Sequence, residues 1–146
     1  MSKTKWWDRE LLTKTQAGLL FLGVISLAIA AESIQNYIRD IKLSDCSVYT
    51  IAVNKRVKYL KLNPWFDYDF SYKNQVLTRD ARIPSSETNE WERVNKAEWE
   101  NRRFWVQVHC EDAKTHKILW DYKVPDTLRF IPQNGWNELP KYAIKK

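Results

Sequence analysis

The feature that most constrains this chain is its uncharged stretch Thr15–Ala31, which lies between Lys14 and Glu32. Fifteen of these residues read AGLLFLGVISLAIAA, and no other part of the chain is apolar over a comparable length. A helix of 17 residues spans roughly 25 Å at ~1.5 Å per residue, close to the lower limit for crossing the hydrocarbon core of a bilayer. The stretch therefore predicts a transmembrane anchor at 15–31, preceded by a cytoplasmic segment at 1–14.

A cleaved secretory signal peptide is the alternative explanation of the same stretch. Ala28-Ile29-Ala30 has the small-x-small pattern of a cleavage site before Ala31, and a basic segment precedes the apolar run. Three features favour retention: two acidic residues in the N-terminal segment, the interfacial pair Trp6-Trp7, and helical spacing that continues through Ser33–Lys42. We predict an uncleaved anchor whose helix continues to about residue 42.

Basic residues are unevenly distributed around the anchor. The C-terminal flank has two, Arg39 and Lys42, and the N-terminal flank has four: Lys3, Lys5, Arg9 and Lys14. The positive-inside rule then predicts a single-pass protein of the inner (cytoplasmic) membrane, with the N-terminus in the cytoplasm and the following domain in the periplasm or outside the cell.

Small residues at Gly23, Ser26 and Ala30 recur at helical spacing on one side of the predicted anchor. Such a stripe allows a second transmembrane helix to approach closely. Small residues are also common in membrane helices that make no such contact. We take the three as a candidate helix-packing stripe, compatible with a homo-oligomer.

The N-terminal part resembles the start of a type IV pilin between Gly18 and Tyr37. A basic leader ends at Gly18, an apolar stretch follows, and Gln35-Asn36-Tyr37 matches the pilin helix locally. The chain departs from that pattern at Gly23, where pilins have a glutamate at the fifth position after the glycine, and its apolar run is shorter. We therefore do not assign the chain to that family.

Composition limits what the remaining residues can do. The chain has 146 residues, a net charge of +6 and only 3 glycines, of which Gly135 alone lies outside the apolar stretch. A glycine-rich phosphate loop is therefore excluded, and no cofactor is predicted. The basic excess is spread along the chain and does not argue for nucleic acid as a partner. About 115 residues remain after the anchor, enough for one small domain.

Alternating patterns predict that residues 43–140 form a mainly antiparallel β domain. Aromatic side chains at 66, 68, 70 and 72 alternate with Asp67, Asp69 and Ser71, so one face is aromatic and the other acidic. Cys46–Val53 and Val57–Leu62 are predicted to form a hairpin around a turn at 54–56.

Further elements are predicted downstream. A strand is expected at 75–83 and a possible short helix at 90–103, capped by Asn89. Phe104–Cys110 and Lys117–Val124 are expected to be strands, the second with Ile118, Trp120, Tyr122 and Val124 on one face. The tail 141–146 is expected to be mobile. The predicted fold class is α+β, one transmembrane helix followed by a small antiparallel domain.

The only two cysteines, Cys46 and Cys110, lie at the ends of two predicted strands. A cysteine pair in an exported domain is typical of a disulfide, and we predict that these two are bonded. The alternative is two buried free thiols.

Candidate catalytic constellations are weak. His109 and Cys110 point to opposite faces of a strand and cannot form a nucleophile pair there. His109, Glu111 and His116 could in principle hold a metal, and Asp67 with Asp69 could form a carboxylate pair, but both sets are explained as ordinary surface residues. We predict no catalytic, metal or cofactor site.

Three tryptophans break the alternation or lie in predicted turns, namely Trp65, Trp105 and Trp136. We take them as candidate exposed contact residues.

The sequence thus predicts a non-enzymatic, membrane-anchored envelope protein whose domain binds a protein partner. An accessory subunit, an immunity or inhibitor protein, and a phage lysis or exclusion protein fit, the last including a holin-like layout. The alternative is a secreted protein with a cleaved signal peptide, acting as a small hydrolase or a carbohydrate-binding module.

Overall fold

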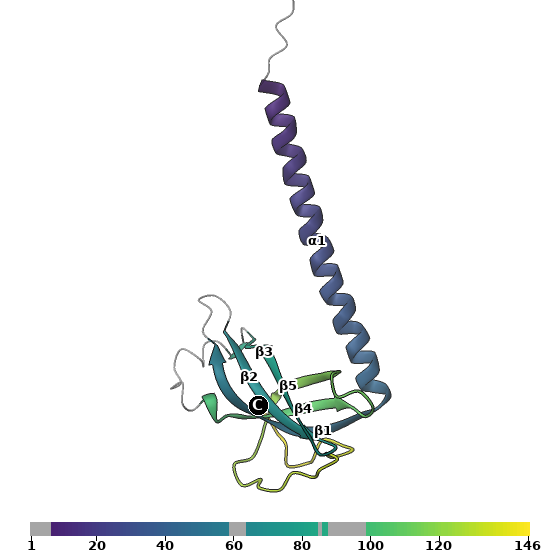
Figure 1. Cartoon of the computed structure of the whole chain (residues 1–146), viewed down its shortest axis with the longest axis vertical. Coiled ribbons are helices and arrows are strands. Elements are labelled where there is room, and N and C mark those ends of the chain that lie inside the picture. The colour runs from purple at the N-terminus through teal and green to yellow at the C-terminus, as the bar shows by residue number, and fades with distance from the viewer. Residues whose placement is uncertain (1–6, 59–63, 85, 88–98) are drawn as a thin grey trace, which may run out of the picture. The chain divides into compact units, whose positions relative to one another are not determined.

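The structure is a computed structural model that describes the backbone of residues 7–58, 64–84, 86–87 and 99–146, and side chains from residue 14 onward. The chain divides into two compact units, Met1–Ile41 and Lys42–Lys146. The described part of the first unit, from Trp7 onward, is helical, and the second unit, which we call the β domain, contains the sheet (Figure 1). The predicted α+β class, one long apolar helix followed by a small antiparallel domain, is confirmed.

Helix α1 runs from Trp7 to Asp45, a length of 39 residues. No proline interrupts it, and its apolar stretch consists largely of leucine, isoleucine and alanine. The hydroxyls of Ser26 and Ser33 donate to carbonyl oxygens four residues earlier, each at 2.9 Å, so neither hydroxyl requires water. Among the described residues, the part of this helix from Lys14 onward is long and apolar enough to cross a membrane. The helix continues beyond the apolar stretch to Asp45, three residues past the predicted end at about residue 42.

The sheet is antiparallel and has the strand order β3-β2-β1-β4-β5-β6. Its strands are β1 (Ser47–Lys58), β2 (Trp65–Tyr72), β3 (Gln75–Arg82), β4 (Arg103–His109), β5 (His116–Lys123) and β6 (Ile144–Lys145). The predicted helix at 90–103 lies mostly outside the described residues, and its last residue, Arg103, already belongs to β4.

The hairpin predicted around residues 54–56 is wrong, because β1 continues through them as one strand of 12 residues. The register between β1 and β2 shifts between Asn54 and Arg56, which marks a β-bulge. Asn54 is 1% exposed, and its side-chain amide donates to the backbone carbonyl of Trp99 at 2.7 Å. A buried hydrogen bond that only the tertiary fold provides thus holds a turn-favouring residue within a strand.

The alternating pattern of β2 is confirmed. The aromatic rings of Phe66, Tyr68, Phe70 and Tyr72 are 0–5% exposed, and Asp67 and Asp69 lie on the other face. The following turn has positive φ angles at Lys73 and Asn74, 48° and 61°, as in the two-residue hairpin turns that match the twist of antiparallel strands. It leads into β3, close to the strand predicted at 75–83.

The two faces of the sheet bury two separate hydrophobic clusters. The larger contains the β2 rings with Trp99, Phe104, Val106 and Val108. The smaller contains Ile51, Trp105 and Val124, and residues of the C-terminal segment pack against it: Leu128, Ile131, Trp136, Leu139 and Ala143. The segment after β5 therefore covers part of the second face.

The face predicted for β5 is only half correct. Ile118 and Trp120 pack into the larger cluster, but Tyr122 and Val124 belong to the smaller one. The register with β4 is irregular, since Phe104 pairs with Lys123 while Trp105 pairs with Leu119. This irregularity moves the end of β5 to the opposite face, as a bulge does.

The tail at 141–146, which was predicted to be mobile, includes β6, and its Ile144 and Lys145 pair with Lys123 and Tyr122. The ammonium of Lys146 lies 2.6 Å from a carboxylate oxygen of Glu87. These contacts, between residues distant in sequence, place the tail against the sheet.

We expect Gly135→Ala to lower the free energy of unfolding of the β domain by more than about 1 kcal/mol, since the left-handed conformation costs an alanine that much on its own. Gly135 has φ +70°, and a Cβ there would lie 2.6 Å from the carbonyl oxygen of Tyr49. The clash would disturb the reciprocal backbone hydrogen bonds between Tyr49 and Trp136, 2.7 and 2.8 Å long, which hold the segment on β1. Urea unfolding followed by tryptophan fluorescence measures the effect. Gly18→Ala is the control, because its Cβ would meet nothing within 4 Å; equal stability of both variants would contradict the expectation.

Candidate functional site

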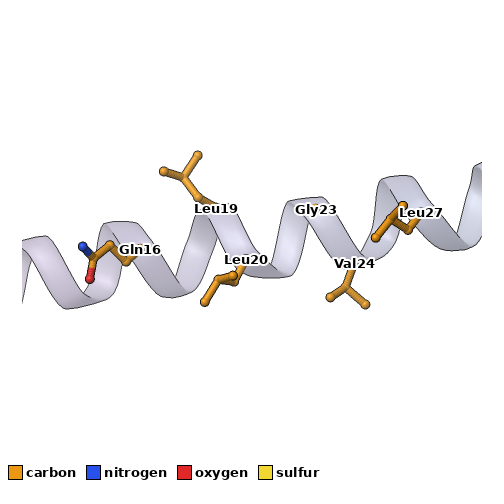
Figure 2. Close-up of a pocket in the computed structure, with 6 residues that line it drawn as sticks. All are labelled: Gln16, Leu19, Leu20, Gly23, Val24 and Leu27. Carbon is orange, nitrogen blue, oxygen red and sulfur yellow. The ribbon is translucent and has the colours of Figure 1, made fainter.

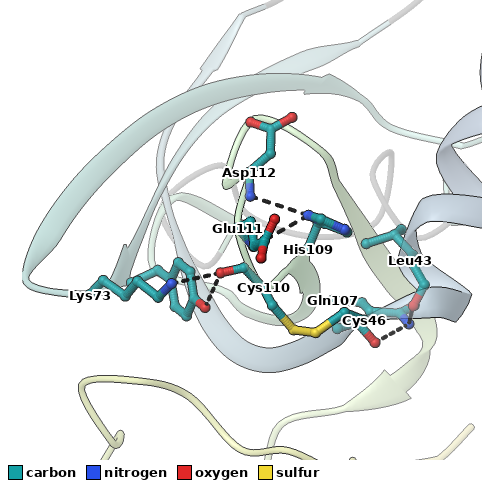
Figure 3. The surroundings of a disulfide bond; sticks show 10 residues. Leu43, Cys46, Lys73, Gln107, His109, Cys110, Glu111 and Asp112 are labelled. Atoms are coloured by element: carbon teal, nitrogen blue, oxygen red, sulfur yellow. Dashed lines mark hydrogen bonds between the residues drawn. A yellow bond between two sulfur atoms is a disulfide. The ribbon is translucent and has the colours of Figure 1, made fainter.

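The disulfide environment shows how the β domain begins (Figure 3). Cys46 and Cys110 form the predicted bond, with S–S 2.00 Å and Cα–Cα 5.6 Å. The register explains it, since Ser47 pairs with His109 and the next residues outward on the two strands are the two cysteines. Among the described residues no cysteine is free.

Contacts around the bond also fix the last turn of α1. Leu43 is 3% exposed, and its carbonyl accepts a hydrogen bond from the side-chain amide of Gln107 at 3.4 Å. The same amide donates to the hydroxyl of Ser47 at 2.9 Å. On the other side, the carbonyl oxygen of Cys110 accepts hydrogen bonds from the Tyr72 hydroxyl at 2.8 Å and the Lys73 ammonium at 2.7 Å. The start of the β domain is thus joined covalently and by hydrogen bonds to β4.

Both histidines are held by hydrogen-bonding contacts. His109 Nδ1 accepts the backbone N–H groups of Glu111 and Asp112 at 3.3 and 3.2 Å, within the turn after β4 (Figure 3). His116 Nε2 lies 2.7 Å from the Tyr68 hydroxyl and its Nδ1 lies 2.9 Å from the Lys114 carbonyl, and one neutral tautomer satisfies both contacts. In the described part of the chain, no three His, Cys, Asp or Glu side chains are arranged to hold a metal ion.

Asp112 stabilises the same turn. Its carboxylate accepts hydrogen bonds from the Thr115 hydroxyl at 2.8 Å and the Lys114 N–H at 3.0 Å. These bonds, the Thr115 bond first, hold the pKa of Asp112 below its ordinary value, because they stabilise the ionised form. The turn is therefore explained by structure rather than by catalysis.

The carboxylate pair of β2 is engaged by neighbouring side chains. Asp67 lies 2.6 Å from the Lys58 ammonium and 2.9 Å from the Arg56 guanidinium, and the hydrogen bond from Lys58, more than that from Arg56, lowers the Asp67 pKa. Asp69 pairs with Lys55 at 3.4 Å and accepts the Thr78 hydroxyl at 2.7 Å. A general acid needs a raised pKa, so Asp67 is poorly suited to that role at neutral pH.

The three candidate contact tryptophans lie in different environments. Trp105 is 0% exposed, so its prediction as an exposed contact residue is wrong. Its break in the alternation of β4 predicts an exposed position, but the C-terminal segment covers that face of the sheet. Trp136 is half-buried and packs edge-on against Trp105, with ring centroids 5.3 Å apart. Trp65 is half-buried at the start of β2. The structure does not bring the three together as one surface.

A different surface of the β domain has the form of a contact site. A groove, which we call the sheet groove, lies on the face opposite the β2 rings, between strands β1–β3 and the segment at 131–133. Its apolar lining includes Ile51, Val53, Val76 and Ile131, and its polar lining includes Lys55, Asp69 and Gln133. Val76 is 68% exposed. An apolar centre with a polar rim is the usual composition of a protein interface.

Sequence patterns could not identify this groove. Its lining comes from four segments, and the segment at 131–133 reaches it through a backbone hydrogen bond of 3.0 Å from Lys73 to Gln133. The only local signal is Val76, an apolar residue in a strand whose neighbours on that face are Thr78 and Asp80.

A second surface lies on α1 alone. A shallow apolar groove, the helix groove, follows the helix and is lined by Gln16, Leu19, Leu20, Gly23, Val24 and Leu27 (Figure 2). Gly23, which has no side chain, lines the groove between Leu20 and Leu27, and apart from its chain neighbours and the nearby helix backbone no atom lies within 4 Å of the position a Cβ would take. Of the predicted packing stripe, Gly23 lines this groove, whereas Ser26 and Ala30 lie beyond it on the exposed helix surface.

Comparison with known proteins adds no family assignment, since no protein-family model, curated protein or solved structure matches the chain. The two grooves and the apolar helix are therefore the features of the described residues that bear on function.

Proposed function

We propose that this chain is a single-pass, membrane-anchored, non-enzymatic envelope protein whose β domain binds a protein partner through the sheet groove. The observation that carries the proposal is Val76, a β-branched apolar side chain that is 68% exposed and lines an apolar groove. Phe130, Tyr142 and Ile144 are also exposed, at 75%, 45% and 54%, but they do not line this groove. Isolated exposed apolar residues are common, but one that borders a groove with further apolar lining is typical of a contact site.

Two further observations support a membrane anchor with the β domain outside the cytoplasm. The apolar helix is long enough to cross a membrane, and its basic flank favours a cytoplasmic N-terminus. The disulfide is compatible with an oxidising compartment, and in a bacterial cell that compartment is the periplasm or the exterior. The accessory-subunit, immunity or inhibitor, and phage lysis or exclusion versions of the proposal all retain this layout.

The alternative, a secreted protein with a cleaved signal peptide, gains no support from the aromatic rings of β2. A carbohydrate-binding module would use exposed aromatic rings, but the four rings of β2 are 0–5% exposed in the larger cluster. Its remaining requirement is cleavage before Ala31. The mass of the intact mature protein decides this: a chain that begins at Met1 supports the anchor, and one that begins at Ala31 contradicts it.

We expect Val76→Asp to weaken capture of the partner by about tenfold or more, since a charge at an apolar contact costs about 1.4 kcal/mol or more. The test uses the full chain with an N-terminal affinity tag, solubilised gently from membranes, with a photo-reactive side chain at position 76 to identify the protein that occupies the sheet groove. Ile144→Asp is the matched control, because Ile144 is also aliphatic, is 54% exposed, and lies in β6 at the opposite edge of the sheet.

The expected result is a specific cross-link at position 76, absent from position 144, and loss of capture in the Val76 variant only. Capture that is equal in both variants, or a chain that never cross-links at position 76 in membranes, would contradict binding through the sheet groove.

A further inference from the structure

A single row of side chains follows one side of α1 from Gln16 to Ile41. Successive members are alternately four and three residues apart, so the row repeats every seven residues. One set of positions holds large aliphatic residues, Leu20, Leu27, Ile34 and Ile41, and the other holds Gln16, Gly23, Ala30 and Tyr37. A 3.5-residue repeat is the spacing that keeps one side of a helix against another helix over a long distance. We call this row the seam.

Lipid would cover only the first half of the seam. Beyond Glu32 the helix carries charged residues and extends past the uncharged stretch. In this second half the seam residues remain exposed, with Ile34 at 58%, Tyr37 at 68% and Ile41 at 49%, and the neighbouring Ile38 is 49% exposed. Apolar side chains concentrated on one side of a helix outside the hydrocarbon layer are typical of a contact with another protein surface.

Charges avoid the seam. Glu32 and Arg39 lie seven residues apart on the side of the helix opposite to it. Asp40 lies at its border, 3.7 Å from the guanidinium of Arg39 on the same helix, which offsets part of its charge. A partner helix could therefore approach the seam without burying an uncompensated charge.

We propose that α1 pairs in parallel with α1 of a second copy of this chain along the seam. The proposal rests on the anchor in the function proposed above, but not on the partner of the β domain. Two copies in one membrane have the same orientation and depth, so each seam residue meets its own counterpart at the same height, as a two-fold interface requires. A different partner helix would need a matching repeat at the same depth.

The residues of the seam suit this pairing. Gly23, between Leu20 and Leu27, and Ala30, between Leu27 and Ile34, let the two backbones approach. Gly23 lines the helix groove (Figure 2). Gln16 would meet its counterpart near the end of the uncharged stretch, where two side-chain amides form a hydrogen bond across the helices. A single polar position of this kind also sets the register of paired helices.

The length of the seam meets what a stable pair needs. It covers 26 residues, nearly four heptads, and a coiled-coil pattern needs about three to four heptads. The aqueous half alone offers only about 200–300 Å² of apolar surface per copy, against about 800 Å² per partner in a standard interface. The pair therefore depends on the membrane half, and the test must use the full chain in membranes.

Cysteine cross-linking in membrane vesicles tests the pairing. Single cysteines are introduced at two seam positions, Ile34→Cys and Tyr37→Cys, and at two positions on the other side, Asn36→Cys and Arg39→Cys. All four residues are exposed or half-buried, so the substitutions leave the β domain intact. After mild oxidation we expect at least about fivefold more linked dimer from the seam variants than from the controls, because only the seam would face its counterpart.

Co-capture of two differently tagged copies is the second measurement. Ile34→Asn is expected to lower co-capture several-fold, and Arg39→Ala to leave it unchanged. Equal cross-linking on both sides of the helix, a maximum at Asn36 or Arg39, or no dimer at Ile34 and Tyr37 would overturn the pairing.

Failure of the pairing and failure of the function proposed above are distinguishable. Loss of the chain from alkali-washed membranes would reject the anchor and the pairing together. If the anchored chain cross-links through the seam but Val76→Asp does not change partner capture, only the partner of the β domain is rejected. If Val76→Asp lowers capture but the seam does not cross-link, only the pairing is rejected.

Discussion

Replacing both cysteines, Cys46→Ser with Cys110→Ser, is expected to lower the free energy of unfolding of the β domain by about 4 kcal/mol. The bond joins residues 64 positions apart, and the chain-entropy model assigns that value, about 4 kcal/mol, to a loop of this length. Since small domains have a total stability of about 5–15 kcal/mol, the variant should be close to unfolding at 37 °C. Urea unfolding of the full chain in detergent, followed by tryptophan fluorescence, measures the loss.

Reduction provides the control for this experiment. A reductant should destabilise the wild-type chain by the same amount and leave the double serine variant unchanged. If the reductant has no effect on the wild type, or if thiol titration of the native protein finds two free thiols, the bond does not stabilise the native fold.

Trp105→Ala is expected to cost about 3–5 kcal/mol of stability, the range found for removing a large buried aromatic side chain. Trp105 is 0% exposed, and its ring packs against Trp136 and Tyr142. Its indole N–H also donates to the carbonyl oxygen of Lys123 at 3.2 Å. Truncation would leave a cavity between the sheet and the C-terminal segment and remove this hydrogen bond.

Trp65→Ala is the matched control for Trp105. Trp65 is also on a strand but is half-buried, so its replacement should cost clearly less. A Trp105 variant that is as stable as the Trp65 variant, and that instead loses its partner, would support the original prediction of a contact residue.

The comparison of these two tryptophans shows why the sequence predicts one face of the sheet better than the other. The β2 rings alternate strictly, and the structure buries all four of them, because a period of two is a local consequence of strand geometry. Burial of Trp105 depends on the segment after Pro125, which returns over the second face. Nothing near Trp105 in the sequence indicates that cover.

The errors in strand boundaries have the same cause. Asn54 favours a turn, and Tyr122 continues an alternating pattern, so local rules predict a turn at Asn54 and the face of Ile118 for Tyr122. A buried hydrogen bond to Trp99 keeps Asn54 in β1, and an irregular register with β4 moves Tyr122 to the other face. Each correction arises from a contact between segments distant in sequence.

The sequence by itself determined the long apolar helix, the antiparallel β domain and the cysteine pair, because continuous hydrophobicity, a period of two and the number of cysteines are local properties. The spacing of the seam residues on α1 can also be read from the sequence, since a 3.5-residue repeat depends on no tertiary contact. Only the tertiary structure decided that Trp105 is buried and that Val76 borders a groove built from β1, β2, β3 and the segment at 131–133. The physical reason is that the exposure of a strand residue depends on which distant segment packs on its face of the sheet. Side-chain alternation shows which residues share a face, but not which segment packs on that face.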